Sequence, residues 1–235
     1  NKRSIGSLRW INGTSLVVRG RAFSGDDVGQ ASPYSRLPLR AHSVVRSPIW
    51  GESRMSAGLF VQFATDASCI FVNYTLLSSS ISEWHFPSTG VAGVDLYGWD
   101  AGNSTWRWTG TSSPKYPVTI TMGKVASLTC KGSCHERVYR LHLPTYAAIS
   151  ALSFGVNSGT KIFKSDSSQL STTKPIVWYG TSILQGGVAS RPGQVNTHIV
   201  SRALSIEVFN FGFSGQGVME LSVAQFLAEV DASIF

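Results

Sequence analysis

The chain has 235 residues, of which 43% are hydrophobic and 14% are charged. This balance excludes a largely disordered chain and supplies enough apolar residues for one large core or two smaller ones. No apolar run approaches the roughly 18 to 20 residues that a membrane-spanning helix needs, so we expect no membrane span.

The formal net charge is +7, and most of the positive excess lies near the N-terminus. Residues 1–54 hold nine lysines and arginines but only three acidic residues. A basic face favours anionic partners such as acidic glycans, phosphate-bearing surfaces or nucleic acid. One interpretation is therefore an anionic partner for residues 1–54. The other is a set of scattered arginines in a basic domain, because no long run of consecutive basic residues occurs.

Apolar and polar residues alternate with a period of two from residue 14 to about residue 157. Leu59, Val61 and Phe63 share one face in AGLFVQFA, and RVYRLHLP and ALSFGV repeat this pattern. The stretches CIFVNYTL, GVDLYGW, TWRWTG and PVTITM are also strand-like, and turns rich in Gly, Ser, Asn and Pro separate them. We therefore predict that residues 1–165 form a β-sandwich, jelly-roll-like domain with seven or more antiparallel strands.

The cysteines indicate a disulfide rather than a metal site. Cys130 and Cys134, in CKGSC, flank a Gly-Ser turn and are predicted to close a small hairpin disulfide. A zinc site needs more ligands than His135 adds to this pair, so we expect neither metal nor cofactor. Localisation is weakly determined, but three glycosylation sequons favour secretion or an organelle lumen. The sequons begin at Asn12, Asn73 and Asn103.

Two tryptophans of TWRWTG offer a candidate substrate-binding surface. Trp106 and Trp108 lie two residues apart on a predicted strand and therefore share one strand face. Such a pair can form a platform on which a sugar ring stacks. Tryptophans on strands also fill sandwich cores or cover rims, and the sequence leaves both interpretations open.

The pattern changes after the polar stretch KSDSSQLSTTKP, and residues 166–175 are predicted to be a linker. IVWYG is a short continuous apolar strand of the kind that parallel sheets bury. A helix over 191–205, a strand from Ile206 to Phe211 and a second helix after NFGFSGQG follow it. This order predicts an α/β portion over residues 176–235, and ASIF is typical of the start of a third strand. Two strands and two helices make an incomplete α/β domain, so we expect the rest of it to lie outside this sequence.

Two glycine-rich turns follow the two predicted parallel strands. In open α/β folds the carboxyl ends of such strands carry the functional site, which brings Ser182 of GTSILQGG near Gly215 of NFGFSGQG. A serine there can attack a carbonyl, while its own N–H and that of the glycine point at the developing oxyanion. Neither turn matches the phosphate-binding GxxxxGK[ST] pattern, which disfavours nucleotide binding.

These stretches resemble the SGNH, or GDSL-type, hydrolases. YGTSI is similar to their first conserved block and NFGFSGQG to their second, and residues 30–235 are similar to a subgroup with a preceding jelly-roll domain. The resemblance implies that Ser182 is the nucleophile and an oxyanion donor, and that Gly215 is a second oxyanion donor. Thr181 stands where many members have Asp. The oxyanion Asn and the C-terminal Asp-x-x-His have no counterpart in this sequence.

The leading interpretation is the front portion of a two-domain SGNH-type serine esterase or acyl transferase. Its substrates would be O-acyl compounds, O-acetylated carbohydrates among them, and a companion chain is one source of the absent blocks. Without its base a serine is a poor nucleophile, so we expect these 235 residues alone to be nearly inert. The alternatives are a non-catalytic relative that serves as a structural or interaction subunit, and a carbohydrate-binding module. Each histidine of the sequence is expected to be an ordinary packed or solvated side chain.

Overall fold

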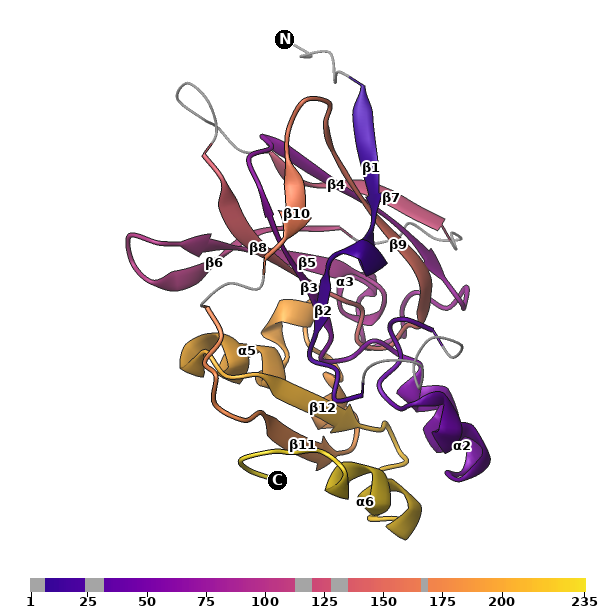
Figure 1. Ribbon diagram of the computed structural model, residues 1–235. Coiled ribbons are helices and arrows are strands. Elements are labelled where there is room, and N and C mark those ends of the chain that lie inside the picture. The colour runs from indigo at the N-terminus through magenta and orange to yellow at the C-terminus, as the bar shows by residue number, and fades with distance from the viewer. Residues whose placement is uncertain (1–6, 24–31, 113–119, 128–134, 166–168) are drawn as a thin grey trace.

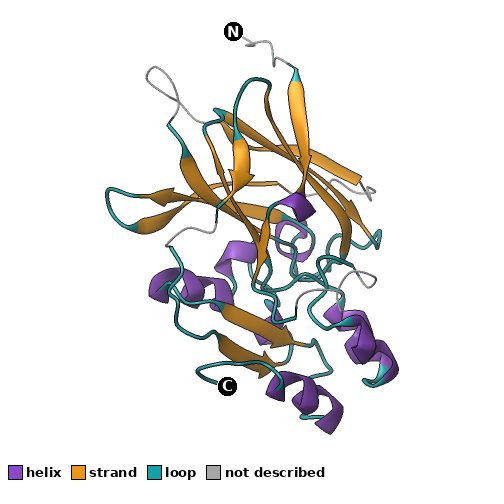
Figure 2. Cartoon of the chain, viewed as in Figure 1, coloured by secondary structure: helices purple, strands orange, loops and turns teal. Residues whose placement is uncertain are grey.

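The computed structural model describes residues 7–23, 32–112, 120–127, 135–165 and 169–235 (Figure 1). Within these residues, antiparallel strands are the main regular structure up to residue 165, and helices surround a smaller parallel sheet after residue 175 (Figure 2). The predicted disulfide between Cys130 and Cys134 lies outside the described residues. No helix among the described residues is long and apolar enough to cross a membrane.

The strands of the first part form two antiparallel sheets. The first sheet has the order β1 (Leu8–Asn12), β9 (Ile149–Asn157), β4 (Cys69–Leu76) and β7 (Ile120–Ser127). The second has the order β10 (Ile162–Lys164), β3 (Phe60–Thr65), β8 (Arg137–His142), β5 (Val94–Asp100) and β6 (Thr105–Ser112), with β2 (Val17–Arg19) also paired to β3. Each of the seven stretches that the sequence marks as strand-like therefore contains an observed strand.

Both sheets contribute to one hydrophobic core. Val61 and Phe63 of β3 and Leu141 of β8 face Val72 of β4 and Phe154 of β9 in this core. The alternation predicted the inward faces correctly, because side chains one residue apart on a strand point to opposite sides. β3 is buried along its whole length, so its second face is covered as well. On that face the Phe60 ring lies beside the His198 ring, and Gln62 donates to the Ser165 carbonyl at 2.9 Å.

The second part is built on two parallel strands, β11 (Ile176–Gly180) and β12 (Val208–Gly212). Ile234 forms a parallel bridge with Ile176, which agrees with the strand start predicted at ASIF. The helices are α4 (Ser182–Gln185), the 3-10 turn η3 (Pro192–Gln194), α5 (Asn196–Leu204) and α6 (Leu221–Ala228). Shorter helical elements of the first part are η1 (Gly13–Ser15), η2 (Leu39–Ser43), α2 (Ser47–Ser53) and α3 (Ser88–Val91).

A second hydrophobic core lies between this parallel sheet and an N-terminal segment. Phe23, Leu37 and Ile49 pack there with Phe211 of β12 and Phe226 of α6. The segment that carries η2 and α2 therefore packs on the α/β part, although it precedes most of the antiparallel strands in the sequence. The domain boundary at residue 165 stays a prediction.

The helix predicted over residues 191–205 is divided into η3 and α5, because Val195 between them is extended. The buried side chains of α5 are Thr197, His198 and Ser201, whereas the apolar Ile199 is exposed. This polar face is buried because it packs against polar side chains of the neighbouring strands. The Asn210 side-chain amide, for example, donates to the Thr197 hydroxyl oxygen at 3.2 Å.

Three arginines of the basic segment form ion pairs with glutamates of the α/β part. The pairs are Arg19 with Glu207, Arg40 with Glu229 and Arg46 with Glu220. Arg36 is buried and donates to backbone carbonyls, among them that of Asn210 at 3.2 Å. Much of the positive charge near the N-terminus therefore lies against this chain's own acidic residues. An external anionic partner stays a prediction.

Candidate active site

Ser182 lies at the first turn after β11. The sequence predicted a buried strand here, but Val177 is the one fully buried residue of β11, and Trp178 is exposed. β11 ends at Gly180, Thr181 continues in an extended conformation, and α4 begins at Ser182. α4 ends after one turn because Gly186 has a φ of 114°, a conformation that side chains disfavour. The tight strand-to-helix turn leaves Ser182 half-buried, with its side chain in the lining of a cavity.

Gly215 lies in the loop after the neighbouring strand. β11 and β12 are paired with Gly180 opposite Gly212, and the Phe213 N–H donates to the Gly180 carbonyl at 2.9 Å. The two loops therefore leave the sheet at the same edge, as predicted from the sequence. Gly215 has a φ of 67°, and a β-carbon added to it would meet open space. Its backbone conformation, rather than crowding within the chain, is the reason for glycine here.

A cavity of about 310 Å³ joins the two loops to the antiparallel part. It is lined by Ser182, Ile183, Gly187 and Val188 of the first loop, Ser214 of the second, and Glu83, His85, Phe86 and Tyr146 of the antiparallel part. The Tyr146 hydroxyl donates to the Ser182 carbonyl at 3.2 Å. Burial raises the pKa of Tyr146, so this phenol stays protonated and remains a donor near neutral pH. Ser182 and the Gly215 loop thus share one cavity.

The sequence did not predict that His85 and Glu83 line the cavity of Ser182. His85 and Glu83 lie in a turn closed by hydrogen bonds between Glu83 and Phe86, and the His85 Nε2 atom is 3.7 Å from a Glu83 carboxylate oxygen. Each side chain is about 40% exposed. Their place beside Ser182 follows from the packing of two segments about a hundred residues apart. The Glu-Trp-His triplet is the one local signal, since its first and third residues are charged or titratable.

Two other histidines lie in the interface between the sheets and α5. The rings of His142 and His198 are 4.0 Å apart, and Arg202 donates to the Nε2 atom of His142 at 3.2 Å. Burial lowers the pKa of both histidines well below the usual range, which keeps both imidazoles neutral. His142 lies on the face of β8 opposite to Tyr139 and Leu141, which lie in the first core.

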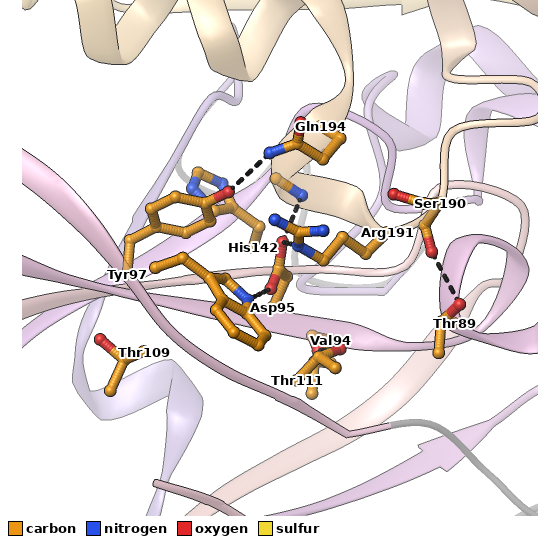
Figure 3. A network of polar contacts seen from close by, with 12 residues as sticks. Thr89, Val94, Asp95, Tyr97, Thr109, Thr111, His142, Ser190, Arg191 and Gln194 are labelled. Carbon is orange, nitrogen blue, oxygen red and sulfur yellow. Dashed lines mark hydrogen bonds and ion pairs between the residues drawn. The ribbon is translucent and has the colours of Figure 1, made fainter. Parts of the chain in front are cut away.

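The loop after α4 is attached to the antiparallel part by a buried carboxylate (Figure 3). Asp95 of β5 accepts hydrogen bonds from Trp108 Nε1 at 2.7 Å and from the Gly193 N–H at 3.0 Å. The Arg191 guanidinium approaches the same carboxylate at 3.1 Å. Gln194 donates to the Tyr97 hydroxyl at 3.0 Å. These contacts hold residues 191–194, and through them the chain that follows Ser182, against β5 and β6.

The two candidate sugar-binding tryptophans differ in exposure to solvent. Trp106 and Trp108 share one face of β6, opposite Trp99 and Tyr97 of β5. Trp106 is only 8% exposed, and the Arg140 guanidinium lies 4.2 Å from the centre of one of its rings. Trp108 is half exposed and contacts Asp95 through its indole nitrogen. Neither lines the Ser182 cavity, and stacking of a sugar stays a prediction.

Two protein-family models match this chain. A family model described as the N-terminus of SGNH hydrolase-type esterases matches residues 8–162, and a GDSL-like lipase/acylhydrolase family model matches residues 173–235. The chain belongs to the SGNH hydrolase-type esterases. The motif that gives the first model its name, GxDLY, occurs here from Gly93 to Tyr97. Asp95 and Tyr97 of this SGNH motif make the contacts to Gly193 and Gln194 described above.

Solved structures of similar proteins include a crystal structure described as a GDSL-like lipase from Bacteroides ovatus, with 27% identity and a TM-score of 0.85. The match covers 96% of this SGNH chain, which spans 62% of the length of that protein. A salicylyl-acyltransferase from a tetracycline biosynthetic pathway has 19% identity and a TM-score of 0.69, over 97% of this chain and 60% of the other.

A third structure, a family two carbohydrate esterase from Cellvibrio japonicus, has 11% identity and a TM-score of 0.51, over 91% of this chain and 55% of the other. At such low identities the last two show a shared fold alone. No curated protein sequence matches the chain.

Proposed function

We propose that this protein is the front portion of a serine esterase or acyl transferase that forms an acyl-enzyme on Ser182. The observation that carries this proposal is the placement of Ser182 at the end of β11, in one cavity with the loop that holds Gly215. A serine at such a turn presents its hydroxyl to an acyl carbon. The family of the chain supports the same reaction class.

In this proposal two backbone groups stabilise the charge that develops on the substrate oxygen. The Ser182 N–H is available because it lies in the first turn of α4, where amides have no partner within the helix. The Gly215 N–H follows Ser214, whose own N–H is already used in a 2.8 Å bond to the Gln185 side chain. The latter bond fixes the second loop against α4. Oxyanion donors held in this way act without reorganisation during the reaction.

We propose that the general base is an Asp-x-x-His segment outside these 235 residues, either in the same polypeptide or in a companion chain. The buried, neutral His142 and His198 are held in the interface away from the Ser182 cavity. His85 lies in the cavity lining, but its ring faces Glu83 and packs 4.4 Å from the Trp84 ring. The span of 62% of the Bacteroides ovatus protein supports a longer functional unit.

We further propose that residues 1–165 are a jelly-roll-like β-sandwich, residues 166–175 a linker, and residues 176–235 the first βαβα portion of an SGNH domain. The core shared by the two antiparallel sheets supports the sandwich. The parallel pairing of β11 with β12 supports the α/β portion. O-acylated carbohydrates are the substrates that we propose, and the family two carbohydrate esterase, which shares the fold, motivates their use as first substrates.

A serine-directed fluorophosphonate probe tests the assignment of Ser182. We expect the full-length protein to be labelled, Ser182→Ala to abolish labelling, and Ser150→Ala, an exposed serine on β9, to leave it unchanged. His85→Gln separates the two sources of the base: labelling that persists favours a base outside these residues. Labelling that survives Ser182→Ala would overturn the proposed nucleophile. A folded full-length protein that no probe labels would instead support a non-catalytic subunit.

A further inference from the structure

The Ser182 cavity opens into a second cavity along the antiparallel part. This second cavity has a volume of about 290 Å³ and shares Glu83, Tyr146 and Ser214 with the first. Its other lining residues come from α2 and α3 and from the loops after α2, β4 and β8; they include Glu52, Met55, Leu77, Ser78 and Ser80. We call the two cavities together the acidic cleft. A molecule held in it would contact the candidate nucleophile at one end and Glu52 at the other.

The charge of the acidic cleft is opposite to that of the chain as a whole. The chain carries a net charge of +7, yet Glu52 and Glu83 are the acidic residues of the lining, and no described lining residue is a lysine or arginine. The buried Arg36 donates to the Glu52 carbonyl at 2.6 Å and offsets part of the Glu52 charge. An anionic substrate group in this narrow space would therefore be repelled mainly by Glu83, because the low dielectric of a partly enclosed cleft strengthens charge interactions. The cleft therefore disfavours acidic substrates that the surface charge would attract.

Glu52 also has unused hydrogen-bonding capacity. Its Oε2 atom is buried and has no hydrogen-bond partner among the described residues. A carboxylate oxygen only accepts hydrogen bonds, and leaving it unsatisfied in a buried position costs free energy. A substrate hydroxyl is a neutral donor for this oxygen, and it reaches the atom once the Glu52 side chain turns toward the cleft, because the oxygen is shielded from solvent in this conformation. Serines 78 and 80 on the same wall can donate or accept further hydrogen bonds with a polyhydroxylated molecule.

An apolar rim lies beside these acceptors. Trp84 is 96% exposed, and its ring centroid lies 4.4 Å from that of His85, which lines the cleft. Ile183, next to Ser182, is 80% exposed, and Val188 is also exposed on the same loop. A fully exposed indole next to hydroxyl-binding carboxylates is an arrangement suited to a sugar ring, whose C–H face stacks on the indole while its hydroxyls reach the acceptors.

We propose that the acidic cleft binds the alcohol portion of the substrate and selects neutral polyhydroxylated rings over anionic ones. Glu52 and Glu83 accept hydrogen bonds from the ring hydroxyls, and Trp84 stacks on the ring. This proposal rests on the proposed function of Ser182 and adds its specificity. It assigns that specificity to the antiparallel part, which supplies all three side chains.

The test compares two acetyl esters on the full-length protein: an acetylated methyl glucoside and the matching acetylated methyl glucuronate. We expect the wild-type kcat/KM for the neutral ester to be about fivefold higher, which corresponds to about 1 kcal/mol of repulsion of the glucuronate by Glu83. Glu83→Gln should raise kcat/KM for the glucuronate ester. Trp84→Ala should raise KM for the glucoside about fivefold, which corresponds to about 1 kcal/mol of lost stacking.

p-Nitrophenyl acetate carries no sugar ring, so its hydrolysis reports on Ser182 without ring stacking or ring hydroxyls, and we expect Glu136→Gln to leave it unchanged. Glu136→Gln, which removes an exposed carboxylate elsewhere on the antiparallel part, is the matched charge control. Equal turnover of both sugar esters by the wild type, with no effect of Glu83→Gln, would overturn the specificity proposal but leave the nucleophile in place. Loss of p-nitrophenyl acetate hydrolysis in Ser182→Ala is the separate test of the reaction itself.

Discussion

The buried carboxylate of Asp95 gives a pH dependence of stability that can be measured directly. Burial raises the pKa of Asp95 to about 6, and the hydrogen bond from Trp108 and the nearby Arg191 oppose this shift only in part. In the unfolded chain an aspartate has a pKa of about 3.9. The folded state therefore binds more protons than the unfolded state between about pH 4 and pH 6.

The sign follows from this difference in proton binding. Stability falls as the pH rises wherever the folded state binds more protons, so the contribution of Asp95 is fully present below about pH 4 and is lost above about pH 6. A shift of about two units corresponds to about 3 kcal/mol in the free energy of unfolding. Asp95→Asn removes the titration and keeps a similar shape. In this variant an NH2 group replaces one carboxylate oxygen, so that a donor faces the Gly193 N–H or Arg191. The loss of this hydrogen-bond acceptor lowers stability by about 1 to 3 kcal/mol at every pH.

Urea unfolding of the wild type and of Asp95→Asn between pH 4 and pH 7.5 provides the assay. We expect the stability advantage of the wild type to be largest at pH 4 and to shrink by about 3 kcal/mol by pH 7.5. The comparison of the two proteins cancels other groups that titrate in this range. An advantage that grows with pH would refute the reasoning, because it would mean that Trp108, Gly193 and Arg191 outweigh burial and hold the carboxylate ionised.

Two further substitutions test the site loop and the first core. Gly215→Ala should lower stability by about 1 kcal/mol through its positive φ alone, because the added β-carbon meets open space; thermal unfolding measures this, and a loss above about 3 kcal/mol would contradict it. Phe154→Ala should cost about 3 to 5 kcal/mol, because the ring is fully buried between the two sheets and its centroid lies 4.7 Å from that of the tilted Phe63 ring. A loss below about 1 kcal/mol in urea unfolding would show that the core collapses around the missing ring.

The local pattern of the sequence predicted the strands well. The alternation in AGLFVQFA, RVYRLHLP and ALSFGV corresponds to β3, β8 and β9, and the inward residues form the first core. The strand predicted from Ile206 to Phe211 is β12, shifted to Val208–Gly212. These predictions succeed because the period of two follows from backbone geometry, and one apolar face per strand is enough to reveal it.

The helices of the α/β part were predicted less well. Spacing of apolar residues placed a helix near Ile199, but the side chains that α5 buries are polar, including Thr197 and His198. A hydrophobic pattern cannot reveal a face that is buried by hydrogen bonds and by contact with another histidine. The same limit applies to Arg36, which is buried and donates to backbone carbonyls of two segments.

The sequence by itself determined the local features of this protein: the strands, the glycine-dependent turns at Gly186 and Gly215, and the placement of Ser182 after a parallel strand. These follow from backbone preferences that act over a few residues. Only the tertiary structure decided what surrounds Ser182. Glu83 and His85 come from a turn about a hundred residues earlier, and Glu52 from a helix earlier still. Their place depends on how the sheets pack on the α/β part through Asp95, a contact that no short-range pattern encodes.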